Sequence, residues 1–344
     1  MDNFIENNLT YIPDNLIRLC IKSYKYLLTD SSYNENKEKE LVEKIKNLER
    51  ITYDTQKANE QHYEVPTDFF KLHLGKHLKY SSCEWEKDLG NNIKHKIVDL
   101  NEAEEYTLKK YQDKMALSNL SVNSRVLEIG CGWGSLSLYN ARKYPHIIFD
   151  SFSNSETQIQ YIKAKIQEYN LNNLNVWKQD INDFVNNESQ NIYDRIVTIE
   201  CIEHCRNFQK LFKKMKNILK DDGLCFIHIL ATKGNSLLLD DNSWMGRNFF
   251  TGGIIPSINL FNYFNDDLVI QHREVISGEH YSKTLEFWLE QMYERKNKIS
   301  KVFEKDFENV FQKWRLFYIM SSESFKYDKG NDMCVAYYIM KKNN

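Results

Sequence analysis

Residues 125–134 read RVLEIGCGWG, and this stretch decides the fold. Its first half is a short apolar run, which is typical of a strand buried on both faces of a parallel sheet. Its second half holds Gly130, Gly132 and Gly134, which let the backbone turn tightly and approach a ligand with no Cβ in the way. A helical pattern follows directly. The stretch therefore predicts a strand–turn–helix unit with a ligand at the turn.

The chain outside that stretch alternates between apolar runs and helical patterns. Predicted strands cover residues 146–152, 175–180, 194–200, 223–231 and 333–340, and predicted helices cover 16–28, 37–50, 102–120, 156–169 and 208–220. This alternation predicts an α/β fold with a mostly parallel sheet. We divide the chain into a helical N-terminal region (1–115), a Rossmann-like core (116–232) and a C-terminal region of helices and final strands (233–344). Without a Gly/Ser/Pro-rich linker, we expect these regions to pack continuously.

The composition excludes several classes of protein. Hydrophobic residues make up 42% of the 344 residues and aromatic residues 13%, which excludes a mainly disordered chain. Lys and Arg number 46 against 48 Asp and Glu, a net charge of −2, so no attraction to nucleic acid or acidic membranes is expected. No apolar run reaches the roughly 18 residues of a membrane span. No secretory signal pattern opens the sequence, so we expect a cytoplasmic protein whose seven cysteines are reduced.

The spacing of the glycines distinguishes between ligands. A dinucleotide site has the pattern G-x-G-x-x-G, with the pyrophosphate at the helix N-terminus. The pattern here, G-x-G-x-G, is one residue short of it. Glu128 stands at the end of the preceding strand, where it suits a ligand that carries an ammonium and a sulfonium and no phosphate. A dinucleotide, or a tight turn without a ligand, remains the alternative.

Polar residues follow the next two predicted strands. Ser153, Asn154 and Gln158 lie in the turn after the second strand. Asp180 ends the third strand, where a carboxylate can accept a hydrogen bond from an adenine amine; its alternative role is to cap the segment after it. Asp150 stands about twenty residues after the glycines, as a ribose-binding acid would, but it lies within a strand.

An acid–histidine cluster ends the strand at 194–200. If the turn after it is helical, Glu200, Glu203 and His204 share one face at the sheet edge where ligands bind. Two carboxylates beside an imidazole can attract a cationic amine, accept its proton and shift one another's pKa. The alternatives are an exposed helix start, whose acids suit the helix dipole, and a metal site. The metal site would use Cys201, His204 and Cys205, but it lacks a second pair of ligands.

With these residues in view, the sequence resembles the cyclopropane-fatty-acid-synthase-like branch of the class I S-adenosylmethionine-dependent methyltransferases. Within that branch it is similar to the coclaurine N-methyltransferases and related alkaloid amine methylases. The resemblance spans residues 54–342. Its motifs are QHYEVPTDFF, LGKHLKYSSCEW, VLEIGCGWGSLSLYNARKY, IECIEHC, WMGRNFFTGGIIPS, GEHYSKTLEFWLEQM and KWRLFYIMSSESF. The motifs near the end of the chain make the branch specific.

The resemblance implies a Rossmann-like methyltransferase with a central, mostly parallel seven-stranded sheet, an N-terminal helical cap over the donor site and a C-terminal helical insertion over the substrate. It implies S-adenosyl-L-methionine as methyl donor, S-adenosyl-L-homocysteine as product, and a small-molecule amine as acceptor. The implied donor-site residues are Tyr80, Ser81, Glu128, Gly130, Gly132, Gly134, Ser153, Asn154, Gln158, Asp180 and Ile181. The implied catalytic residues are Glu200, Glu203, His204 and Tyr281, and the substrate-facing residues are His228, Trp314, Phe317, Tyr318 and Glu323.

Two positions separate amine from lipid substrates within this branch. Lipid cyclopropane synthases carry a cysteine where this chain has Ser82, and that cysteine helps hold a bicarbonate base. Cys83 is one place off, so its side chain should point elsewhere. Glu200 stands where the lipid enzymes tend to have a small residue. Both departures favour an amine, while a phospholipid cyclopropane synthase, a lipid methyltransferase and a non-catalytic binding protein remain alternatives, and a homodimer is possible.

Overall fold

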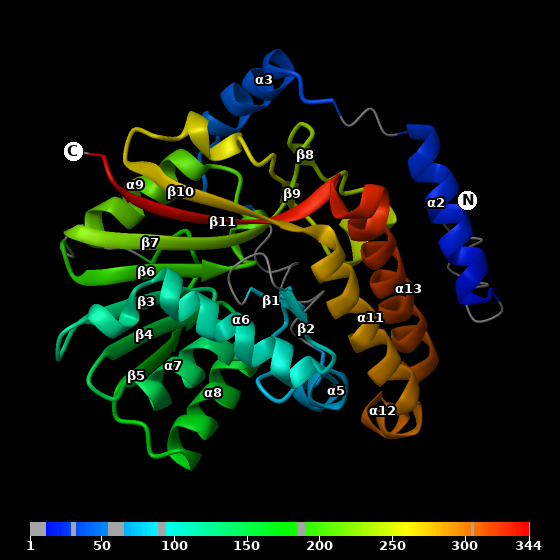
Figure 1. Ribbon diagram of the computed structural model, residues 1–344, viewed down its shortest axis with the longest axis horizontal. Coiled ribbons are helices and arrows are strands. Elements are labelled where there is room, and N and C mark those ends of the chain that lie inside the picture. The colour runs from blue at the N-terminus through cyan, green and yellow to red at the C-terminus, as the bar shows by residue number, and fades with distance from the viewer. Residues whose placement is uncertain are drawn as a thin grey trace.

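The computed structural model describes residues 12–28, 32–53, 65–88, 94–184, 190–303 and 306–343, without the side chains of 24–28. A seven-stranded sheet in the order β10-β11-β7-β6-β3-β4-β5 runs through its centre (Figure 1). Its strands are β3 (Arg125–Ile129), β4 (Ile148–Ser153), β5 (Leu174–Lys178), β6 (Tyr193–Ile199), β7 (Leu219–Thr232), β10 (Leu268–Ser277) and β11 (Met333–Lys342). β7, β6, β3, β4 and β5 are parallel, and β11 pairs antiparallel with β7 and β10. The predicted α/β class and mostly parallel sheet are confirmed.

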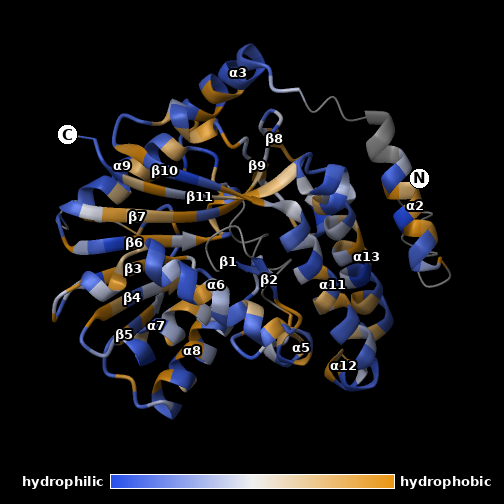
Figure 2. Ribbon diagram, in the orientation of Figure 1, coloured by the Kyte–Doolittle hydropathy of each residue, from blue (hydrophilic) through white to orange (hydrophobic). Residues whose placement is uncertain are grey.

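Helices cover both faces of the sheet because successive side chains of each strand point to opposite sides. Leu127 of β3 packs with α3 (Glu35–Lys46) and α9 (Phe208–Ile218). Its neighbour Val126 packs on the other face, where the helices are α6 (Leu100–Lys114), α7 (Ser135–Lys143) and α8 (Glu156–Glu168). Figure 2 shows hydrophobic residues along the strands and hydrophilic residues on the outward helix faces. Two apolar cores therefore hold β3, and with it the glycine turn.

A third core lies beside the sheet and is rich in aromatic residues. The chain leaves β10 into α11 (Gly278–Glu294), α12 (Lys296–Phe303) and α13 (Phe307–Lys326) before it returns as β11. These helices pack with α2 (Asp14–Leu28) and α5 (Thr67–His73), at the right of Figure 1. The predicted helical insertion in the C-terminal part is therefore present. Because β10 and β11 complete the sheet of the core, the division at residues 232 and 233 stays a prediction.

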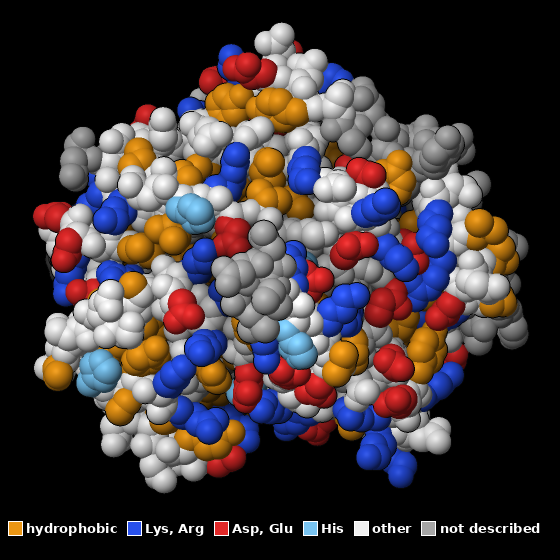
Figure 3. Space-filling view, viewed as in Figure 1, with side chains coloured by type: hydrophobic (Ala, Val, Ile, Leu, Met, Phe, Trp, Pro, Cys, Tyr) orange, Lys and Arg blue, Asp and Glu red, His pale blue; other side chains and the backbone are white. Residues whose placement is uncertain are grey.

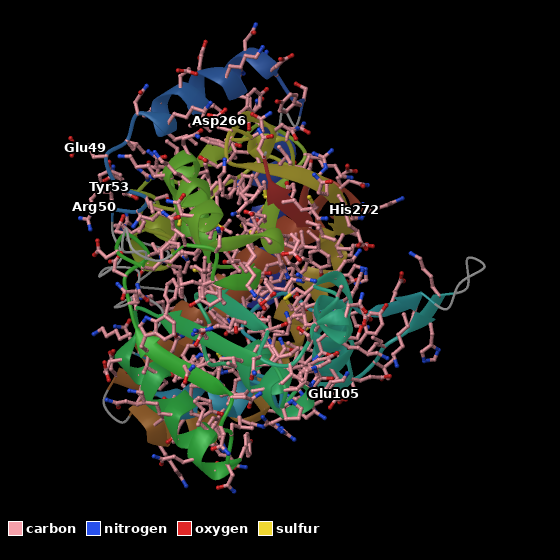
Figure 4. The ribbon with its side chains drawn as sticks, turned by 90° about the vertical axis from the view of Figure 1, so that its left-hand side faces the viewer. Glu49, Arg50, Tyr53, Glu105, Asp266 and His272 are labelled. Atoms are coloured by element: carbon pink, nitrogen blue, oxygen red, sulfur yellow. The ribbon has the colours of Figure 1, made fainter. Side chains whose placement is uncertain are left out.

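The sequence patterns predict neither β10 nor most of the short elements, and they extend α3 beyond its end at Lys46. The short elements are β1 (Glu86–Asp88), β2 (Lys94–Lys96), β8 (Leu237–Leu238), β9 (Ile254–Ile255), α10 (Trp244–Asn248) and the 3₁₀ turns η2 (Leu117–Asn119), η3 (Ile202–His204), η4 (Leu260–Tyr263) and η6 (Tyr327–Gly330). After α3, the Tyr53 hydroxyl accepts hydrogen bonds from the Glu49 and Arg50 N–H groups at 3.0 and 3.3 Å (Figure 4). These contacts close the turn by which α3 leads back toward the sheet.

The surface mixes both signs of charge. On the face drawn in Figure 3, basic and acidic side chains are interspersed. Within the described ranges, no helix is both long and apolar enough to cross a membrane. All seven cysteines are free thiols, and five of them, Cys83, Cys131, Cys205, Cys225 and Cys334, are buried. Buried free cysteine behaves as a small hydrophobe, as the sequence predicts.

Candidate active site

A cavity lies at the carboxyl ends of β3, β4, β5 and β6, and the segment before β1 lines it as well. Ligands of open parallel sheets bind at this edge. The predicted donor-site residues that line it are Tyr80, Ser81, Glu128, Gly130, Gly132, Ser153, Asn154, Gln158 and Ile181. Glu200 and His204 line the same cavity. The structure therefore brings most of the predicted donor residues and two of the predicted catalytic residues together.

The glycine turn takes the left-handed conformation that favours glycine. Gly130, Gly132 and Gly134 have φ of +74°, +52° and +76°. A Cβ on Gly130 would overlap the Cys201 side chain, so this glycine lets the turn after β6 approach β3. A Cβ on Gly132 would meet nothing nearer than Gln158 Nε2 at 4.0 Å, so the second glycine keeps the cavity wall open.

Two of the predicted donor residues do not line the cavity. Gly134 precedes α7 as its N-cap, and a Cβ there would press on Ile162 of α8. Asp180 Oδ1 accepts hydrogen bonds from Asn182 N at 2.7 Å and Asn182 Nδ2 at 2.9 Å. Asp180 thus fills the capping role that was its alternative, and its contact with adenine stays a prediction. Asp150 pairs with Arg125 at 2.5 Å inside the sheet and is not a ribose ligand in this arrangement.

Buried polar groups lie where β3 and β4 meet the cavity, the part that we call the donor end. Glu128 is 5% exposed and accepts a hydrogen bond from the Ser137 hydroxyl. Burial raises the pKa of Glu128 to about 8. Gln158 Oε1 accepts from the Ser153 hydroxyl at 2.7 Å. Its amide Nε2 is buried and has no hydrogen-bond partner among the described residues, so one donor is left for a ligand.

Glu200 directly follows β6 and has a left-handed conformation, with φ of +41°. The continuous helical turn expected over residues 200–204 is therefore not formed, and only η3 is helical. This conformation places Glu200 between two hydrogen-bond donors, Ser82 and Tyr281, and close to the His228 ring. Oε1 lies 2.9 Å from both Ser82 N and His228 Nε2, and Oε2 accepts from the Tyr281 hydroxyl at 2.5 Å. Burial alone would raise the pKa of Glu200, but His228, Lys79 and Tyr281 outweigh it and hold that pKa below its usual value.

Glu203 and His204 follow in η3, where Glu203 is buried and His204 is half-buried. Glu203 is 3% exposed, and its Oε2 has no hydrogen-bond partner in the described part of the chain. Burial, with the nearby charge of Glu200, raises the pKa of Glu203 well above its usual value. The His204 ring stacks on Phe250 with centroids 5.0 Å apart, and burial lowers its pKa to about 4. The imidazole on the cavity wall is therefore neutral at pH 7, and its lowered pKa makes it a weak base.

Tyr281 and His228 stand behind Glu200 rather than on the cavity wall. The Tyr281 hydroxyl binds Glu200, and His228 lies between Glu200 and the Tyr111 hydroxyl, 2.5 Å from His228 Nδ1. Burial lowers the pKa of His228, and Glu200 opposes this only in part. Both residues therefore act on this carboxylate directly. Their roles in the reaction stay predictions.

The four predicted substrate-facing residues of α13 do not line the cavity. Phe317 stacks on Phe249 with centroids 4.1 Å apart, and the Tyr318 hydroxyl lies 2.6 Å from His73 Nε2. Trp314 is 1% exposed within the same aromatic core. Glu323 is paired with Arg18 of α2 at 2.9 Å. Three of the side chains thus pack in the aromatic core and the fourth forms an ion pair, and a substrate-facing role for the four residues stays a prediction.

Sequence reasoning missed several residues at the cavity and behind it. Those on the wall are Thr52, Leu78, Cys131, Trp133, Ser135, Phe152, Gln179, Ile199 and Thr251, while Cys201 and Cys205, considered above only as metal ligands, line it as well. Burial raises the pKa of Cys201 to about 12, so in the absence of a bound ion it is a thiol. Across the described ranges, no group of three or more His, Cys, Asp or Glu is arranged to hold a metal ion. Lys79 was also missed, although a lysine two residues before the predicted donor residue Ser81 was a visible signal.

Comparisons with known proteins agree with this geometry. The family described as mycolic acid cyclopropane synthetase matches residues 51–334. (S)-Coclaurine N-methyltransferase of Thalictrum flavum subsp. glaucum is 30% identical over 305 residues, which are 85% of this chain and 81% of that protein. The crystal structure of a coclaurine N-methyltransferase bound to N-methylheliamine and SAH superposes with a TM-score of 0.86, at 28% identity, over 98% of this chain and 99% of that one. The cyclopropane synthase MmaA2 of Mycobacterium tuberculosis shares the fold, with a TM-score of 0.69 at 21% identity over 85% of this chain and 99% of that one.

Proposed function

This chain belongs to the mycolic acid cyclopropane synthetase family and has the class I methyltransferase fold, and from that premise we propose that it transfers a methyl group from S-adenosyl-L-methionine to the nitrogen of a small-molecule amine. S-Adenosyl-L-homocysteine is the second product. One observation carries the proposal. A single cavity is lined by the glycine turn with Glu128 and also by Glu200 and His204. A cationic donor and an amine with a proton to lose can therefore meet in one place.

The donor end of the cavity fits a ligand that carries a positive charge and an atom able to accept a hydrogen bond from an amide N–H. Glu128 supplies a carboxyl group, Gln158 an unused amide donor, and Gly132 a wall with no Cβ. The donor, when bound, supplies an electrophilic methyl group and a good leaving group. The protein's own work is positioning, which can contribute on the order of 7–11 kcal/mol. Tyr80 and Ser81 line the same cavity from the segment before β1.

The part of the cavity lined by Glu200 and His204, the acceptor end, suits an amine that must lose a proton before it reacts. An amine is protonated at neutral pH and then has no lone pair with which to attack. The raised pKa of the buried Glu203 means that its carboxylate binds a proton more tightly than an ordinary glutamate. Glu203 is therefore the stronger base and the neutral His204 imidazole beside it the weaker one. Such a base contributes typically about 10²–10⁴-fold to a rate. Glu200, held by hydrogen bonds from Ser82 and Tyr281 beside the His228 ring, provides a fixed negative charge for the ammonium product.

A lipid substrate is the second candidate, because the family is described by a lipid reaction. The segment at Ser82 and Cys83 argues against it. Ser82 reaches Glu200 through its backbone N–H, while Cys83 is fully buried and its Sγ lies 3.9 Å from the Ser81 carbonyl oxygen. Cys83 does not line the cavity, which supports an amine rather than a lipid substrate. Burial also raises its pKa to about 12, which leaves no thiolate.

The proposal is tested by incubating the protein with labelled methyl donor, a panel of primary, secondary and tertiary amines, and phospholipid vesicles together. Label in an amine supports the proposal, whereas label in the lipid pool would replace it with the lipid reaction. Calorimetry with the donor alone is the companion measurement, because absence of binding would favour a non-catalytic protein of the same fold. A cytoplasmic location and a homodimer stay predictions from the sequence.

A further inference from the structure

Lys79 carries an ammonium group that is almost entirely buried beside the candidate active site. The residue is 1% exposed. Its Nζ donates to Ser81 Oγ at 2.7 Å, to the Ser82 carbonyl oxygen at 2.5 Å and to the Ser81 carbonyl oxygen at 3.3 Å. An ammonium has three N–H donors, so each has an oxygen to bind. Burying such a cation costs free energy, which indicates a use for it at this position.

The three oxygens that Lys79 binds belong to the segment that closes the site. Ser81 lines the cavity, and Ser82 donates its N–H to Glu200 Oε1 at 2.9 Å. Lys79 therefore binds the carbonyl oxygen of Ser82, while the N–H of the same residue donates to Glu200. A shift of this turn by an ångström would break the contact with Glu200, because hydrogen bonds weaken steeply beyond their normal length.

Lys79 is itself fixed from the α6 side. Glu104 of α6 accepts the Lys79 N–H at 3.3 Å and the His77 N–H at 2.8 Å. The Tyr111 ring, also on α6, lies 5.3 Å from the Lys79 ammonium, within cation–π range. Tyr111 continues through His228 to the same Glu200 carboxylate. Two routes from α6 thus meet at Glu200, and Lys79 is the charged member of one of them.

We propose that Lys79 is a positioning residue for methyl transfer: its buried ammonium fixes the turn at Ser81 and Ser82, so that the Ser82 N–H meets Glu200 and the donor cavity keeps its shape. This inference rests on the proposed function and deepens it. The positive charge adds to the effect, because Lys79 is one of the groups that hold the pKa of Glu200 low, after burial and His228 are counted. Lys79 thereby balances the charge of Glu200 and leaves Glu203 and His204 to take the substrate's proton.

The test compares Lys79→Met, which has a similar length and no charge, with Lys79→Arg, which keeps a cation. Lys110→Met is the matched control, since Lys110 pairs with Glu84 and Glu274 at 2.8 and 2.7 Å and does not line the cavity. For K79M we expect kcat to fall about 10–100-fold and the donor Kd to rise about tenfold per folded molecule, the size of a lost charged hydrogen bond. K79R should recover most of both. K110M should lower the melting temperature and leave both constants near wild type.

The pH profile separates positioning from mere stability. Glu200 is faced by His228 from β7, Tyr281 from α11, Ser82 and Lys79 from the segment before β1, and Glu203 from η3. Loss of the Lys79 charge should raise the pKa of Glu200, so the acid limb of the kcat profile moves to higher pH in K79M and stays in place in K79R.

The inference is overturned if K79M only melts earlier, with kcat, donor Kd and acid limb as in the wild type. Should K79M fail to fold, Lys79→Gln gives the same comparison, because it also lacks the charge. Donor binding and amine methylation by the wild-type protein test the proposed function separately. A wild-type protein that neither binds donor nor methylates amines refutes that function, whereas an active wild type with an indifferent Lys79 refutes only this inference.

Discussion

In the ligand-free protein, the position of Glu128 in a cavity for a cationic donor conflicts with the raised pKa of its carboxyl group. It lines the donor end of the cavity, and burial raises its pKa to about 8, so it is mostly protonated at pH 7. A cationic donor should favour the ionised form. We therefore expect donor binding at pH 7 to release about one proton, measured by calorimetry in two buffers of different ionisation enthalpy. Glu128→Gln should bind more weakly and release none. Equal proton release by this variant would assign the proton to another group.

The second residue-scale prediction concerns proton removal from the amine. Glu203→Gln and His204→Asn each delete one group of the proposed base without changing the donor wall, because Glu203 does not line the cavity and His204 lines it at the acceptor end. We expect kcat to fall about 10²–10⁴-fold while the donor Kd changes little. Steady-state kinetics and donor calorimetry measure the two constants, and circular dichroism checks the fold. Loss of donor binding or of the fold in both variants would refute the catalytic assignment.

At the scale of elements, the strand–turn–helix at β3 and α7 could be predicted because its signal is local. Three glycines between an apolar run and a helical pattern need left-handed backbone, whatever surrounds them. The role of α13 could not be predicted in the same way. From the sequence, Trp314 and Phe317 are equally compatible with a place in the core and with a place in the wall of a substrate site. Only their packing against distant segments distinguishes the two. Glu323 is the clearest case, since its partner Arg18 lies 305 residues away in the chain.

The turn itself gives a prediction that separates two kinds of glycine. Gly132→Ala should cost about 1–2 kcal/mol in the free energy of unfolding, because only left-handed strain is added. Gly130→Ala adds overlap with the Cys201 side chain, which costs a further ~1–3 kcal/mol. Urea unfolding should therefore rank G130A below G132A, while donor calorimetry should show weaker binding in both. The reverse order of stability would mean that the turn after β6 can move away from β3.

On the scale of the whole molecule, the fold follows from strand–helix alternation, but the shape of the site depends on buried charge that no local pattern reveals. The order of β10 and β11 brings α11 to the sheet edge, and α11 carries Tyr281 to Glu200. Periodicity predicts β11, but it predicts neither β10 nor the contact between Tyr281 and Glu200. The same buried charges also set how stability depends on pH, because the folded protein and the unfolded chain bind different numbers of protons.

Two sets of buried groups make the free energy of unfolding depend on pH in opposite ways. Burial lowers the pKa of His73 to about 3 and that of His204 to about 4, so stability is lost as pH falls below the unfolded value of 6.5. Burial raises the pKa of Glu104 to about 7 and that of Glu128 to about 8, so stability is lost as pH rises above the unfolded value of 4.5. Three further histidines have lowered pKa values: His77, His228 and His280. The histidines therefore dominate below pH 6.5 and the glutamates above it.

The ligand-free protein should accordingly be most stable near pH 6.5, and Glu128 gives the test of the alkaline side. Its ionisation costs about 2 kcal/mol between pH 6.5 and 8 by linkage. Glu128→Gln should remove that part of the fall, so its melting temperature exceeds that of the wild type at pH 8 and matches it near pH 5. Glu105→Gln is the control, because this exposed carboxyl on α6 (Figure 4), paired with Lys76, has a lowered pKa and titrates only in acid. Parallel curves for E128Q and the wild type above pH 6.5 would show that Glu128 is already ionised in the folded protein.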